Sequence, residues 1–93
     1  MSRRALHLRI TGRVQGGGYR AWIIERAAAL GLCGWVRNRG DGRVEALVIG
    51  DDAPLAAIVA ACREGPRWAA VRQVEARDAD DDGSAGFTAK PTG

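Results

Sequence analysis

The chain has 93 residues, of which 46% are hydrophobic and 27% are charged, as expected for one globular domain over residues 1–93. Its net charge of +3 is unevenly placed: residues 1–50 hold nine arginines and three acidic residues, whereas residues 51–93 hold five basic and eight acidic residues. No apolar run approaches the roughly 20 residues of a membrane-spanning helix, and residues 1–4 do not resemble a signal peptide, so we expect a cytoplasmic protein with no membrane partner.

The first predicted element is a strand over residues 5–11. Apolar residues alternate strictly along this segment, so that Leu6, Leu8 and Ile10 lie on one face of the strand. This pattern is typical of a half-buried strand. After a glycine-rich loop, apolar residues recur at helical spacing up to Gly31, which predicts a helix that ends with this glycine in a left-handed conformation. The further predicted elements are strands over 33–39 and 43–49 joined by a turn at 40–42, a helix over 51–65, a strand over 71–77, an acidic loop over 78–86 and a short strand over 87–90.

This order of elements favours one fold class. The order is strand–helix–strand–strand–helix–strand, followed by a short edge strand. Two helices of this kind most easily cover one face of an antiparallel sheet. The sequence therefore predicts a ferredoxin-like α+β sandwich, with an antiparallel sheet and both helices packed on the same face.

The glycine-rich loop has the composition of an anion-binding turn. Residues 12–20 read G-R-V-Q-G-G-G-Y-R and contain no acidic residue. Gly18 can begin the following helix but offers no side-chain acceptor, so the first N–H groups of the helix need water or a ligand. These N–H groups carry partial positive charge, and Arg20 adds a fork of donors that matches phosphate or carboxylate oxygens.

Two motifs together resemble those of the acylphosphatases. The first is residues 12–20, and the second is Gly34-Trp35-Val36-Arg37-Asn38, which continues as Gly42-Arg43-Val44 and Gly50. The resemblance covers nearly the whole chain and departs at Gly17, where the family usually has valine. It implies the same sandwich fold and hydrolysis of a carboxyl–phosphate anhydride to carboxylate and inorganic phosphate, with no metal, no cofactor and no phosphoenzyme.

The resemblance also implies which residues act. Arg20 would bind the phosphoryl group together with the backbone amides of Gln15, Gly16, Gly17, Gly18 and Tyr19, and Asn38 would orient the attacking water. The partner would be a small-molecule acyl phosphate, with a phosphate or sulfate ion able to occupy the same loop, and the simplest expectation is a monomer. We expect the strand of Asn38 to lie beside the first strand, and Tyr19 to anchor the loop in the core rather than to act as a catalyst.

Elementary chemistry agrees with these roles. An acyl phosphate has a good leaving group, so positioning and neutralisation of the phosphoryl oxygens can supply the catalysis. Neither motif contains an aspartate or glutamate that could act as a general base. A water molecule held by the side-chain oxygen of Asn38 is therefore the simpler mechanism.

The departure at Gly17 predicts a looser loop. A missing valine side chain removes apolar packing, worth about 1.5–3 kcal/mol if fully buried, and glycine adds backbone freedom. We expect weaker substrate affinity with intact chemistry, so that restoring valine would lower KM.

Other patterns point to alternatives. A small basic ferredoxin-like domain could bind nucleic acid, but His7, Arg9 and Thr11, the outward positions of the first strand, provide no aromatic pair for base stacking. An accessory module of carbamoyl-transfer maturation proteins shares the same motifs, and the short chain argues against it. The remaining weaker patterns are a dinucleotide fingerprint over 16–21, a calcium-loop start over 78–83, and Cys33 and Cys62, which we expect to be free structural thiols.

Overall fold

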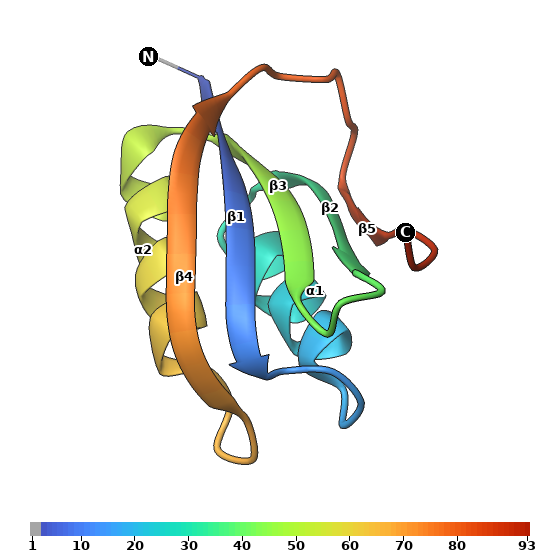
Figure 1. Cartoon of the computed structure of the whole chain (residues 1–93). Coiled ribbons are helices and arrows are strands. Elements are labelled where there is room, and N and C mark those ends of the chain that lie inside the picture. Colours follow the sequence, from blue (N-terminus) through green and yellow to red (C-terminus); the bar gives the residue numbers. More distant parts are fainter. Residues whose placement is uncertain (1–2) are drawn as a thin grey trace.

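The computed structural model describes residues 3–93 and shows a sheet with two helices on one of its faces (Figure 1). The elements are β1 (Arg4–Arg13), α1 (Tyr19–Ala29), β2 (Cys33–Asn38), β3 (Val44–Gly50), α2 (Asp52–Glu64), β4 (Ala70–Ala79) and β5 (Phe87–Ala89). The strand order in the sheet is β4-β1-β3-β2-β5. This arrangement confirms the ferredoxin-like α+β sandwich.

The four strands β1 to β4 pair antiparallel, as expected, and the added short strand β5 pairs in parallel with β2. The chain leaves β4 at one edge, crosses the end of the sheet and joins the opposite edge in the direction of β2 (Figure 1). One expected detail is wrong: β2 does not lie beside β1, because β3 pairs with both strands and separates them. The residues of β3 from Ala46 to Ile49 are all buried, which suits this strand to the interior position.

The main core lies between the helices and the sheet. α2 buries Leu55, Ile58, Val59 and Cys62, the stripe expected at helical spacing. α1 buries fewer side chains, namely Tyr19, Ile23 and Ala27. The sheet contributes the core residues that face the helices, which are Leu8, Ile10, Val36, Val44, Ala46, Val48 and Val74. This packing fixes the start of α1, and with it the end of the glycine-rich loop, against the sheet.

The end of α1 also has the predicted geometry. Gly31 has a φ of +71°, and the N–H groups of Gly31 and Leu32 donate to the carbonyls of Ala28 and Ala27 at 3.0 and 2.9 Å. These paired bonds satisfy carbonyls that the helix leaves open at its end. Neither helix in residues 3–93 is long and apolar enough to cross a bilayer.

Both cysteine thiols are free, as expected. Cys62 is fully buried in α2, and burial raises the pKa of its thiol to about 11. Cys33, at the start of β2, is only partly buried. The Cys62 thiol therefore stays protonated near neutral pH and acts as a small apolar side chain.

Candidate active site

The loop between β1 and α1 has an unusual backbone conformation. Gly16, Gly17 and Gly18 have φ values of +75°, +81° and +89°, in the left-handed region that favours glycine. Gly18 is the N-cap of α1, and no side chain caps the helix there. The three glycines thus allow the chain to turn sharply from the end of the sheet into α1.

The backbone donors of this loop have no acceptors in the described part of the chain. From Gln15 to Ala21 no backbone N–H donates a hydrogen bond, and the first intrahelical bond runs from Trp22 to the carbonyl of Gly18 at 2.9 Å. The first turn of α1 carries no acidic residue. Unpaired N–H groups at a helix start attract an anion.

These donors border a cavity of about 490 Å³. The cavity is lined by the predicted residues Gly16, Gly17, Gly18, Tyr19, Arg20 and Asn38, and by the apolar residues Val14, Ala21, Ile24 and Ala89. The fold therefore brings the ends of both sequence motifs together at one cavity, although their strands are not neighbours. Gln15 is the one predicted site residue that does not line it.

Gln15 instead joins the two motifs. Its side-chain amide nitrogen donates to the backbone carbonyls of Arg39 at 2.8 Å and Arg43 at 2.7 Å, on the two sides of the β2–β3 turn. Because Asn38 directly precedes Arg39, this contact holds the second motif close to the loop. It also explains how Asn38 reaches the cavity from a strand that is separated from β1 by β3.

Arg20 is partly buried and lies in the first turn of α1. Within residues 3–93 no carboxylate lies within ion-pair distance of its guanidinium, and no side-chain hydrogen bond involves it. Its charge at a helix start opposes the helix dipole, an arrangement that becomes favourable when an anion binds between them.

Asn38 presents an unused acceptor. Its Oδ1 atom is buried and has no hydrogen-bond partner among the described residues. Its backbone is held at the end of β2, where its carbonyl accepts from the N–H of Gly93 at 3.1 Å. Buried acceptors are almost always paired, so an unpaired one on a residue that lines a cavity indicates a place for water or a ligand.

Tyr19 is the core anchor that the sequence predicts. Its side chain is 1% exposed and its hydroxyl donates to the carbonyl of Cys62 at 3.3 Å. Burial raises the pKa of the Tyr19 phenol far above its ordinary value, so the hydroxyl remains protonated. Its role is to fix the start of α1 against α2.

Trp68 is the residue near this loop that the sequence analysis misses. It lies in the turn between α2 and β4. This turn is at the same end of the molecule as the glycine-rich loop (Figure 1). A side chain at position 17 would place its Cβ 3.1 Å from the Trp68 indole, tighter than ordinary packing. The Trp68 indole therefore packs where the sequence predicts a loss of apolar packing at Gly17. No local pattern around Trp68 signals this contact, because the two residues lie far apart in the sequence.

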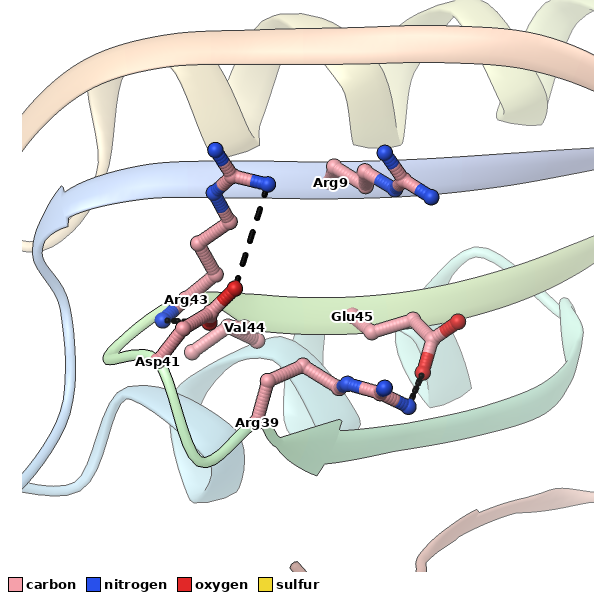
Figure 2. A pocket seen from close by; sticks show the side chains of 6 residues that line it. All are labelled: Arg9, Arg39, Asp41, Arg43, Val44 and Glu45. Atoms are coloured by element: carbon pink, nitrogen blue, oxygen red, sulfur yellow. Dashed lines mark hydrogen bonds and ion pairs between the residues drawn. The ribbon is translucent and has the colours of Figure 1, made fainter. Parts of the chain in front are cut away.

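A second cavity, of about 140 Å³, opens on the sheet face opposite the helices (Figure 2). Arg39 donates to Glu45 at 3.2 Å, and Arg43 lies 3.9 Å from Asp41, so acidic groups already accompany two of the three arginines that line it. Burial alone would raise the pKa of Glu45, but hydrogen bonds from His7 and Arg37 outweigh it and lower that pKa to about 2. This cavity differs from the site at the loop, where Arg20 has no such partner.

Comparisons with known proteins agree with the geometry. A family model described as acylphosphatase matches residues 6–89. An acylphosphatase from Acidiphilium cryptum is 46% identical over 89 residues, which cover 96% of this chain and 98% of the relative. The solved acylphosphatase structures from Coxiella burnetii and Bacillus subtilis have TM-scores of 0.91 and 0.89 at 28% and 32% identity. The match to the Coxiella structure covers 95% of this chain and 93% of that chain. The match to the Bacillus structure covers 92% of this chain and 97% of that chain. The chain belongs to the acylphosphatase family and is a hydrolase that acts on acid anhydrides.

Proposed function

We propose that the loop and Arg20 bind the phosphoryl group of an acyl phosphate. The unpaired N–H groups of residues 15–21 supply donors from the backbone, and Arg20 supplies a planar guanidinium with no carboxylate of residues 3–93 within ion-pair distance. Inorganic phosphate or sulfate would bind the same donors, because both are tetrahedral oxyanions. All of these groups come from one chain, and we propose that the monomer is the active unit.

Asn38 orients the attacking water. The observation that carries this role is that Asn38 lines the same cavity as Arg20 and that its buried Oδ1 atom has no partner among the described residues. With a water O–H donated to Oδ1, the water oxygen attacks phosphorus and the bond from phosphorus to the carboxyl oxygen breaks. The electron pair of that bond leaves with the carboxylate, one hydrogen of the water stays on the attacking oxygen, and the other moves to a second oxygen of the phosphate. The products are a carboxylate and dihydrogen phosphate, which together carry the charge of the substrate dianion.

The acyl group lies against the apolar part of the cavity. Ala21 and Ile24 of α1 and Ala89 of β5 line this part, and none of them offers a side-chain hydrogen bond. Charge neutralisation is therefore concentrated at the phosphoryl end. The apolar surface favours acyl groups that are themselves apolar.

The experiment compares two variants with benzoyl phosphate as substrate and inorganic phosphate as inhibitor. Arg20→Ala should lose phosphate binding and nearly all activity. Asn38→Ala should lower kcat on the order of 100-fold while phosphate still inhibits at the parent concentration. Arg72→Ala, which removes an exposed arginine on β4, serves as the control for lost charge. Near-normal kcat in Asn38→Ala would contradict the role of Asn38 in orienting water, and unchanged phosphate inhibition in Arg20→Ala would overturn the binding site.

A further inference from the structure

Trp68 is an exposed tryptophan that the mechanism above does not use. It is 42% exposed, and it is the only large apolar side chain classed as exposed among residues 3–93. The N–H of Ala69 donates to the carbonyl of Pro66 at 3.0 Å, which closes a turn with Trp68 inside it. An exposed indole held in an ordered turn next to a binding loop indicates a function at that position.

The indole lies against the backbone of the loop. Atoms Cε3 and Cζ3 of Trp68 would both lie 3.1 Å from a Cβ at position 17, so the six-membered ring occupies the space that a side chain there would need. By contrast, a Cβ at Gly16 or Gly18 would meet no atom within 4 Å. Of the three consecutive glycines, only Gly17 is backed by another part of the chain.

The indole is itself positioned by the core. The rings of Tyr19 and Trp68 meet edge-to-face, with centroids 6.4 Å apart and an interplanar angle of 86°. Tyr19 is buried and is held by its hydrogen bond to Cys62. The contact therefore runs from the helix core through Tyr19 and Trp68 to Gly17. Trp68 does not line the 490 Å³ cavity and supports the loop from outside it.

We propose that Trp68 is a positioning residue that holds the glycine-rich loop in its anion-binding conformation before substrate arrives. Glycine has more backbone freedom than any other residue, and three in succession would otherwise sample many conformations. A loop ordered in advance loses less entropy on binding. This inference rests on the proposed function, because it takes the loop to be the phosphoryl site. It also reverses the expectation for Gly17→Val, which should now raise KM.

The first test compares Trp68→Ala with the conservative variant Trp68→Phe. Trp68→Ala should raise both KM for benzoyl phosphate and the inhibition constant of inorganic phosphate by about fivefold, with kcat within about twofold of the parent. Trp68→Phe should restore both constants toward the parent values. Phosphate should change the tryptophan fluorescence of the parent, and this change should be lost in Trp68→Phe. Parent-like constants in Trp68→Ala would overturn the proposal.

The second test is a double-mutant cycle with Gly17→Ala and Trp68→Ala. Because the new methyl group collides with the indole only when the indole is present, Gly17→Ala should raise KM more in the parent than in the Trp68→Ala background. Equal effects in the two backgrounds would contradict the contact. Arg20→Ala distinguishes a failure of the positioning role of Trp68 from a failure of the proposed phosphoryl site. If Arg20→Ala loses phosphate binding and Trp68→Ala binds phosphate as tightly as the parent, only the positioning role of Trp68 is contradicted. If Arg20→Ala still binds phosphate, the proposed function is contradicted.

Discussion

The side-chain amide of Gln15 donates to the backbone carbonyl of Arg39 at 2.8 Å, and this bond joins the glycine-rich loop to the residue that follows Asn38. The same amide nitrogen donates to Arg43 at 2.7 Å, so one side chain holds both sides of the β2–β3 turn. In the proposed mechanism, the distance between the bound phosphoryl group and the oriented water therefore depends on the side chain of Gln15. This side chain touches neither of them and acts through the β2–β3 turn.

Gln15→Ala should lower kcat more than it weakens phosphate binding. It removes both hydrogen bonds and leaves two carbonyls without this donor, which should cost about 1–2 kcal/mol of unfolding free energy. Misplacement of Asn38 should lower kcat on the order of tenfold. The measurements are urea unfolding and steady-state hydrolysis of benzoyl phosphate.

The matched control for this prediction is Gln73→Ala. Gln73 lies exposed on β4 and makes no side-chain hydrogen bond in the described structure. It should keep the kcat and the unfolding free energy of the parent. A parent-like kcat in Gln15→Ala would show that Asn38 is positioned without this contact.

Stability should fall in acid partly through Glu45. The pKa of Glu45 is lowered from its ordinary value of 4.5 to about 2 in the folded protein. A carboxyl with a depressed folded pKa stabilises the fold above its unfolded pKa, and this contribution disappears as the pH falls through the folded pKa. The contribution should therefore be full above pH 4.5 and should disappear between pH 4.5 and about 2.

Glu45→Gln tests this prediction through thermal unfolding at a series of pH values. The parent should be more stable than the variant at pH 6, and the difference should shrink as the pH falls toward 2. The comparison removes the effect of the other carboxylates, since both proteins retain them. A difference in stability that does not depend on pH would mean that the ion pairs of Glu45 contribute nothing to folding.

Ile24→Ala should alter the preference for acyl groups. Ile24 lines the apolar part of the cavity, one helical turn after Arg20. Loss of this surface should cost about 1 kcal/mol of binding for a benzoyl group, which raises KM for benzoyl phosphate about fivefold. The inhibition constant of inorganic phosphate should stay at the parent value, because phosphate has no acyl group. Equal KM changes for acetyl phosphate and benzoyl phosphate would place the acyl group elsewhere.

Hydrolysis should continue in the presence of EDTA. Carboxylate is a good leaving group, and in the proposed mechanism Arg20 and the loop N–H groups neutralise the phosphoryl oxygens. We expect equal rates after extensive dialysis against EDTA and after addition of excess Mg²⁺. A rate that falls in EDTA and returns with Mg²⁺ would show that a metal ion takes part.

Local sequence patterns predict the parts of the fold that depend on neighbouring residues. The unpaired start of α1, its end at Gly31 and the buried stripe of α2 all follow from spacing within one turn or one helix. The loop glycines and Arg20 are found for the same reason. The roles expected for Arg20 and Asn38 rest on the resemblance of the two motifs to the acylphosphatases, because an asparagine before a turn is by itself more typical of a hairpin.

Contacts between segments that lie far apart in the sequence are the features of the fold that local sequence patterns do not predict. β4 extends through Asp78 and Ala79 because Leu6 and Ala5 of β1 pair with them, although aspartate is a poor strand former. The contact of Trp68 with Gly17 is another example, since it joins two loops that meet only when the sheet has formed. Strand order and loop packing of this kind depend on the whole core.

The short strand β5 has a consequence for how this catalyst can diversify. β5 carries Ala89 to the acyl side of the proposed site, whereas Ala21 and Ile24 reach that side from α1, next to the proposed phosphate donors. β5 thus contributes to the acyl side from a part of the chain that lies far from those donors in the sequence. We expect substitutions near Ala89 to change which anhydrides are cleaved with little effect on the reaction at phosphorus.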